Sequence, residues 1–118
     1  MILFSSSGRR LAPIIEFQSR GSAAAEVATG SGEAHVHVVE IAAGGEIGPH
    51  VAGFGQLFVC LDGGGWVAAA NGERVSISGG EVAYFARGEL HSKGSGEGLR
   101  ALIIQVRDLD VRDRSSLG

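Results

Sequence analysis

Two of the four histidines of this chain, His50 and His91, lie in glycine-rich stretches. An imidazole can bind a divalent metal, hydrogen-bond a ligand or exchange a proton near neutral pH. The segment GPHVAGFGQ, residues 48–56, places His50 two residues before Ala52 and six before Gln56. Tyr84 precedes His91, and its hydroxyl could pair with a histidine as an acid–base couple. The chemistry open to these residues is metal binding, ligand binding or proton transfer.

The segments that carry these residues have the length and composition of short β-strands. The expected strands are residues 35–41, 56–61, 66–70, 74–78, 81–86 and 100–106. The Asn71-Gly72 pair between two of them predicts a tight hairpin with a type I′ turn. Residues 22–28 could form at most a short helix. Many short strands separated by glycine-rich turns predict an all-β sandwich or jelly-roll barrel.

The spacing of the two histidine stretches resembles the two sequence motifs of the cupin superfamily. The first family motif reads glycine, five residues, His-x-His, three or four residues, glutamate, six residues, glycine. The second reads glycine, five residues, Pro-x-Gly, two residues, histidine, three residues, asparagine. The matching positions here are Gly44, His50, Ala52, Gln56 and Gly63, then Gly80, Ala86, Gly88, His91 and Ser95. The resemblance covers about residues 36–106 and implies a cupin-type double-stranded β-helix.

In cupins, two histidines and the glutamate of the first motif converge with the histidine of the second motif on one divalent metal. The resemblance therefore places His50 and His91 at ligand positions, Gln56 at the carboxylate position and Ala52 at an emptied histidine position. Ala86 and Ser95 replace residues that concern turn geometry. The resemblance also implies a ligand pocket that contains His50, Ala52, Gln56 and His91, which Tyr84 could join.

The replacements at Ala52 and Gln56 put the metal in doubt. Two neutral imidazoles and a neutral amide offer no negative charge to offset the dehydration of a dication. We therefore expect a degenerate or absent site, with zinc, nickel, copper, manganese or iron bound weakly if at all. His50, Gln56 and His91 are the candidate metal ligands, and His50, His91 and Tyr84 are the catalytic candidates.

These residues leave three functions open. The first is the binding of a small molecule in the barrel mouth by a cupin without a functional metal site. The second is a metal-dependent oxygenase or isomerase that uses His50, Gln56 and His91. The third is a metal-free epimerase or isomerase with a histidine base and Tyr84 as acid. His35 and His37 could supplement the pocket or lie on a face covered by solvent or a partner, because a one-residue change of register reverses the assignment.

Length and composition favour one soluble domain. The 118 residues are 44% hydrophobic and 19% charged, which suits a single globular unit with a core at about 33–106, an arm at 1–32 and a charged tail at 107–118. The net charge of −3 provides no basic surface for nucleic acid. No segment has the composition of a signal peptide or the ~20 apolar residues of a membrane span. We expect a cytoplasmic homodimer that binds a small molecule, without membrane or nucleic-acid partners.

Overall fold

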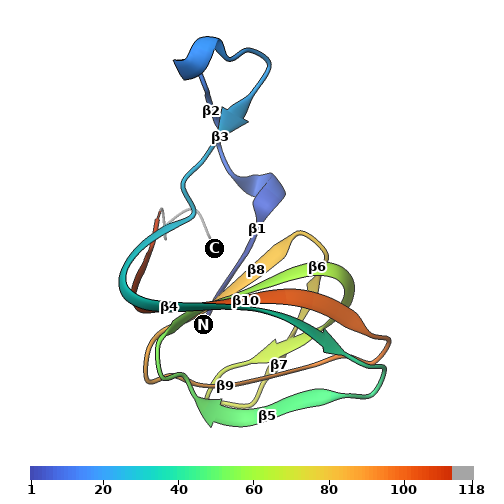
Figure 1. The fold of residues 1–118 in the computed structure, drawn as a ribbon. Coiled ribbons are helices and arrows are strands. Elements are labelled where there is room, and N and C mark those ends of the chain that lie inside the picture. The colour runs from blue at the N-terminus through green and yellow to red at the C-terminus, as the bar shows by residue number, and fades with distance from the viewer. Residues whose placement is uncertain (113–118) are drawn as a thin grey trace.

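The larger of two facing β-sheets contains five antiparallel strands. The computed structural model describes residues 1–112. In this sheet the strands follow the order β1 (Ile2–Ser5), β8 (Glu81–Phe85), β6 (Gly55–Ala68), β10 (Leu99–Val111) and β4 (Ala28–Ile41). The order is not the chain order, so neighbouring strands come from distant parts of the sequence, as Figure 1 shows.

The second sheet is smaller and carries both histidine motifs on neighbouring strands. It contains β5 (Glu46–Val51), β9 (Leu90–Gly94), the second half of β6 and β7 (Arg74–Ser78), in that order. Because β6 belongs to both sheets, the two sheets are joined along one strand and fold over a common interior (Figure 1). This arrangement is a cupin-type jelly roll, and the predicted all-β class is confirmed.

Strand β6 joins two segments that the sequence predicts as separate strands. The glycines between them allow the strand to bend from one sheet into the other. Gly63 has a φ of +77°, and a Cβ there would lie 2.2 Å from the carbonyl oxygen of Gly98. Any other residue would therefore clash with the backbone of the neighbouring strand. The register of β6 with β10 shifts at this place, between Arg100 and Ala101.

The glycines of the two motifs share a backbone conformation that favours glycine. Gly44, Gly63, Gly80 and Gly88 have φ values of +80°, +77°, +89° and +87°. L-residues with a Cβ rarely adopt this left-handed region. Ser95 also has a turn function, because its Oγ accepts from the Gly98 amide and donates to the Gly64 carbonyl. The motif spacing therefore encodes the turns that set the ends of the strands.

Two apolar clusters lie on opposite faces of the larger sheet. The inner cluster fills the space between the sheets and includes Phe58, Cys60, Ile77, Phe85 and Leu99. Burial raises the pKa of the Cys60 thiol, as expected for an inert buried cysteine. The outer cluster consists of Phe4, Leu57, Val82, Tyr84 and Val111, together with the partly buried side chains around them. Alternate residues of β6 and β8 thus belong to different clusters.

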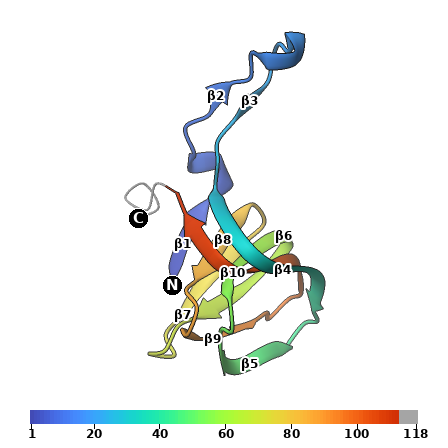
Figure 2. The ribbon, with the colours of Figure 1, turned by 60° about the vertical axis from the view of Figure 1, so that its left-hand side comes forward.

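A hairpin near the N-terminus stands clear of both sheets (Figures 1 and 2). It contains β2 (Ala12–Pro13), β3 (Ala23–Ala24) and a 3-10 turn at Glu16–Gln18, after a first 3-10 turn at Ser6–Gly8. Its tip exposes Ile15 and Phe17, whose side chains are 79% and 92% exposed. The helix suggested for residues 22–28 is wrong, because this segment forms β3 and leads into β4 in extended conformation.

Three further expectations differ from the structure in detail. The turn at Asn71-Gly72 is not type I′, since Asn71 does not have positive φ; the Gly72 amide bonds the Ala69 carbonyl, and only Gly72 is left-handed. The paired strands extend from Ala28 to Val111, beyond the expected core at 33–106. Of the charged tail, residues 107–111 belong to β10 and residues 113–118 lie outside the described part of the chain.

Within residues 1–112, no helix is long and apolar enough to cross a bilayer.

Candidate functional site

The two motif histidines face each other across neighbouring strands. His50 on β5 is the register partner of His91 on β9. Their ring centroids are 4.4 Å apart, with the planes tilted by 52°. His50 is exposed and its Nδ1 is 2.8 Å from the Gly48 carbonyl oxygen, whereas His91 is only 1% exposed. The pair therefore reaches from the surface into the interior.

A buried lysine lies directly behind His91. Lys93 is two residues further along β9, so its side chain points to the same face. Its Nζ is 2.7 Å from His91 Nδ1, and its residue is 1% exposed. The amine also lies 4.8 Å from the ring centroid of Phe85 and 5.3 Å from that of Phe58. The Phe85 ring in turn stacks on His91, with centroids 4.4 Å apart.

Burial changes the acid–base behaviour of both inner groups. Burial, together with the smaller effects of the charges of Lys93 and His50, lowers the pKa of His91 to about 3. His91 is therefore a neutral imidazole at neutral pH. Burial also lowers the pKa of Lys93 to about 7, far below that of an exposed lysine. The amine can therefore be present in charged and uncharged forms under physiological conditions.

Gln56 lies on the inner face of the larger sheet, beside the same phenylalanine. It is the register partner of Phe85 on β8 and of Gln105 on β10, and directly opposed residues share a face. Gln56 is 3% exposed. Its Nε2 and the Nε2 of His91 have no hydrogen-bond partner within residues 1–112. Two buried polar groups are therefore unsatisfied, which costs stability. The end of the barrel that contains Gln56 and His91 is called the polar end below.

Ala52 follows β5 and is buried, with 4% of its surface exposed. Its amide bonds the Glu89 carbonyl at 2.9 Å, which continues the pairing of β5 with β9 by one further step. Because side chains alternate along a strand, this places Ala52 on the same side of the backbone as His50. A methyl group thus occupies the position where the family motif has its second histidine.

The structure also settles which way His35 and His37 face. His35 pairs with Gln105 and His37 pairs with Ile103, and these partners are in turn opposite Gln56 and Phe58. Both histidines therefore lie on the inner face of the larger sheet, although both are exposed. The His35 ring stacks with His37 and Phe54 at centroid distances of 6.4 and 6.1 Å, and its Nε2 is 2.6 Å from Glu33. The exposed His35 and His37 and the half-buried Phe54 form a row of rings at the polar end of the barrel, which is called the aromatic ledge below.

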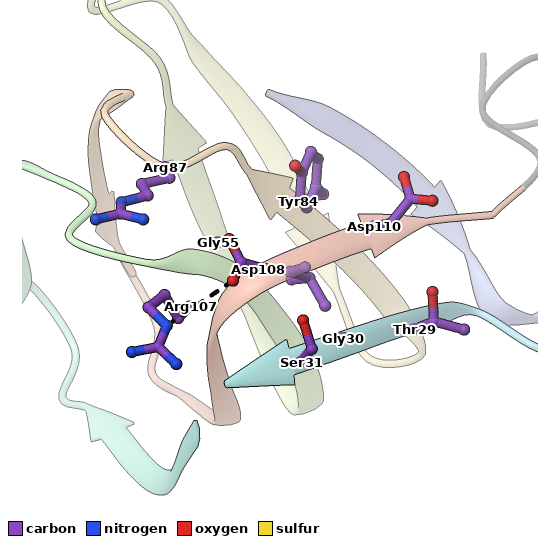
Figure 3. Close-up of a pocket in the computed structure, with 10 residues that line it drawn as sticks. Thr29, Gly30, Ser31, Gly55, Tyr84, Arg87, Arg107, Asp108 and Asp110 are labelled. Carbon is purple, nitrogen blue, oxygen red and sulfur yellow. Dashed lines mark ion pairs between the residues drawn. The ribbon is translucent and has the colours of Figure 1, made fainter. Parts of the chain in front are cut away.

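Tyr84 is separated from the histidines. It belongs to the outer apolar cluster and faces away from the interior that its neighbour Phe85 enters. Tyr84 instead lines an open cleft of about 510 Å³ between the ends of β4, β6 and β10 and the loop after β8, together with Arg87 and Arg107 (Figure 3). Arg107 lies 3.8 Å from Asp108 in the same cleft. The structure thus does not assemble the histidine–tyrosine couple.

The side chains at the motif positions do not fit a tightly held divalent ion. Within residues 1–112, no three or more histidine, cysteine or acidic side chains are grouped to hold a metal. The two imidazoles have a neutral amide and a methyl group at the remaining positions, so no carboxylate supplies negative charge. Lys93, bonded to His91, adds an amine that becomes cationic below about pH 7. A charged Lys93 amine, bonded to one of the two imidazoles, would repel a divalent metal ion bound by the same imidazoles.

Lys93 is the residue that sequence reasoning missed. The signal was present in the segment LHSKG, because period-two alternation puts Lys93 on the face of His91. A lysine beside a turn is ordinarily solvated, so its sequence position suggested no function.

The fold agrees with comparisons to known proteins. Residues 36–111 match the family of AraC-like ligand binding domains. This protein belongs to that family, and its fold is that of the cupin superfamily. No curated protein matches the chain.

Several solved structures are similar to this chain. A cupin superfamily protein from Desulfitobacterium hafniense has a TM-score of 0.60 at 12% identity, over 70% of this chain and 77% of the other. A conserved protein with a double-stranded β-helix domain from Klebsiella pneumoniae has a TM-score of 0.59 at 20% identity, over 79% and 86%. A predicted oxalate decarboxylase from Thermotoga maritima has a TM-score of 0.53 at 25% identity, over 60% and 64%.

Proposed function

We propose that this chain binds a small organic molecule at the polar end of its barrel, without depending on a resident metal. The observation that carries the proposal is the pair of unsatisfied nitrogens, Gln56 Nε2 and His91 Nε2, inside an otherwise apolar interior. Buried polar groups are nearly always paired, so two unpaired groups at one end of the barrel suggest a partner that binds there. The match to a ligand-binding family supports the same conclusion.

Residues with accessible rings lie around Gln56 and His91 and offer further contacts to a ligand. His50 adjoins His91 at the surface, and the aromatic ledge of His35, His37 and Phe54 lies on the inner face of the neighbouring sheet. Flat rings bury apolar ligand surface while ring nitrogens make hydrogen bonds. Small-molecule sites typically combine these features.

Ligand screening by NMR on the full chain tests this proposal. The imidazole Cε1–H resonances of the four histidines report on the mouth directly. A small molecule that binds there should shift the His50 and His91 resonances, and His50→Ala should weaken its binding. Molecules that shift only residues around Tyr84 would contradict the proposal, because they would bind in the cleft of Figure 3.

An enzyme is the second candidate. The similarity to a predicted oxalate decarboxylase favours an enzyme in general terms. The form expected from the sequence is a metal-dependent oxygenase or isomerase of the cupin type, with His50, Gln56 and His91 as ligands. Elemental analysis of protein purified without an affinity tag separates the two. Near-stoichiometric iron or manganese would favour the enzyme, and a metal content far below one ion per chain would favour the binding domain.

We also propose that the protein is a homodimer. Strand β4 is the edge of the larger sheet, and its outward-facing Val36 and Val38 are each 64% exposed. A long edge strand with exposed apolar side chains favours association. Light scattering should report twice the chain mass of 12.1 kDa, and Val38→Lys should lower it toward one chain. A wild-type mass of one chain would contradict this.

Cytoplasmic location and the lack of nucleic-acid and membrane partners stay predictions from the sequence.

A further inference from the structure

Two polar side chains inside the barrel, Lys93 and Gln56, offer N–H groups that have no acceptor among residues 1–112. In that part of the chain, Lys93 Nζ has one hydrogen-bond partner, His91 Nδ1, at 2.7 Å. A charged amine donates one N–H to that nitrogen, and an uncharged amine accepts the proton of the ring instead. In either form the amine retains at least two further N–H groups. The amine nitrogen lies 4.8 and 5.3 Å from the ring centroids of Phe85 and Phe58, so aromatic rings surround it.

Gln56 adds donors next to the same ring. Its Nε2 carries two N–H groups and has no partner within the described residues. Gln56 and Lys93 both border Phe85, the first through the sheet register and the second through its 4.8 Å contact with the ring. When Lys93 is charged, His91 Nε2 carries the ring proton and becomes another donor.

Within residues 1–112, Lys93 also has no acidic partner. None of the ion pairs of these residues includes this lysine, although it is only 1% exposed. A buried amine surrounded by aromatic rings can reduce its cost by pairing with an anion that enters the site. The partner that would satisfy these groups must therefore bring several acceptor oxygens, and negative charge would favour it.

We propose that the ligand of this site carries a carboxylate group, which Lys93 and Gln56 bind from the two sides of Phe85 that they border. The inference rests on the proposed binding function and specifies its ligand class. One carboxylate offers enough lone pairs to accept from both side chains. Bonds between an ammonium group and a carboxylate are about twice as strong as neutral ones. The exposed His50 is the surface end of this cluster, so the rest of the ligand extends past it toward the aromatic ledge.

Acetate is the simplest probe, and acetamide is its neutral counterpart with nearly the same shape. Each is titrated into the full chain at constant ionic strength, with the Lys93 Cε–H and Gln56 side-chain amide resonances as readout. We expect acetate to shift both resonances and to bind at least about tenfold more tightly than acetamide, the effect of one charge-assisted hydrogen bond.

Two substitutions with the same change of charge locate the binding. Lys93→Met keeps the length of the side chain, and it should reduce acetate affinity by about tenfold or more. Arg87→Met removes a positive charge from the cleft of Figure 3, on the other side of the larger sheet, and should leave the affinity unchanged. Circular dichroism verifies that each variant is folded.

The outcomes separate this inference from the proposed function. Equal binding of acetate and acetamide, or acetate affinity unchanged in Lys93→Met, overturns the carboxylate assignment. If other small molecules still shift His50 and His91, the binding function stands without it. If acetate binding is lost in Arg87→Met instead, the anion binds in the outer cleft and the inference is wrong. If no molecule shifts His50 or His91, both proposals fail.

Discussion

The two ends of the barrel interior lie on the same strands but differ in chemistry. At one end, Ile41 and Leu99 are register partners on β4 and β10 and pack in the inner apolar cluster. At the other end of the same strands, the paired residues are His35 and Gln105, and Gln56 lies opposite Gln105 on β6. The first end has the composition that stabilises a core. The second end contains groups that reduce stability.

The groups that reduce the free energy of unfolding are thus located at the end of the barrel where we propose that the ligand binds. Burying an unsatisfied amide, or an amine without an ion-pair partner, opposes folding. The polar end contains both among the described residues, in Gln56 and in Lys93. The apolar end compensates by efficient burial of its aliphatic side chains, with Ile77 at 1% and Ile41 at 5% exposure. Substitutions at the two ends should therefore change stability in opposite directions.

The largest effect is expected at the apolar end. Ile77 is 1% exposed and belongs to the inner cluster. Ile77→Ala removes buried methyl groups and leaves a cavity, which should lower the free energy of unfolding by ~2–5 kcal/mol. Urea denaturation followed by circular dichroism measures this. A loss below ~1 kcal/mol would show that the apolar end is not tightly packed.

Restoring the family residues at the polar end should create a metal site. The double substitution Ala52→His with Gln56→Glu adds an imidazole and a negative charge beside His50 and His91. We expect manganese affinity to rise by ~100-fold, which is ~2.7 kcal/mol. Calorimetric titration with manganese measures the change. The single substitution Ala52→His is the control and should give a smaller gain; equal affinity in the double variant and wild type would mean that residues 52 and 56 do not converge with the histidines.

The buried lysine should make stability depend on pH. Folding lowers the pKa of Lys93 from about 10.5 to about 7, so between these values the unfolded chain binds more protons than the folded chain. Stability should therefore rise with pH in this range, by up to ~1.4 kcal/mol per unit. Lys93→Met removes this contribution, and it should be more stable than wild type at pH 7 and below.

Urea denaturation of both proteins from pH 6 to pH 10 checks this expectation. The stability advantage of Lys93→Met should shrink as the pH rises, because deprotonation removes the cost in the wild type. Titrating groups that do not contact Lys93, such as Cys60, contribute equally in both proteins and cancel in the difference. His91, which contacts Lys93, has a pKa of about 3 and is already neutral over this range. A difference that stays constant over this range would show that Lys93 is not desolvated.

The same contrast explains what could be predicted from the sequence. Strands β4, β6, β7, β8 and β10 contain enough apolar residues for their existence to be predicted, and the motif glycines indicated the turns. Strands β5 and β9 were missed, because EIGPHV and LHSKG have little apolar alternation. Their inward positions carry the polar site itself, so the hydrophobic signal is weakest where the function is expected. The protruding hairpin has no apolar partner in this chain that a local pattern could indicate.

The smallest effect is expected for Gln56, and it tests whether this residue is unsatisfied. Gln56→Leu removes a buried amide whose Nε2 lacks a partner, so stability should be unchanged or increase by about 1 kcal/mol. Ser95→Ala is the matched control, because Ser95 is equally buried but its Oγ has two hydrogen bonds. Its loss should cost ~1–3 kcal/mol, since it leaves buried backbone groups without partners. Urea denaturation of both variants in ligand-free buffer makes the comparison. A loss for Gln56→Leu as large as that for Ser95→Ala would mean that Gln56 supports the fold, and the polar end would then lack the unsatisfied donor on which ligand binding depends.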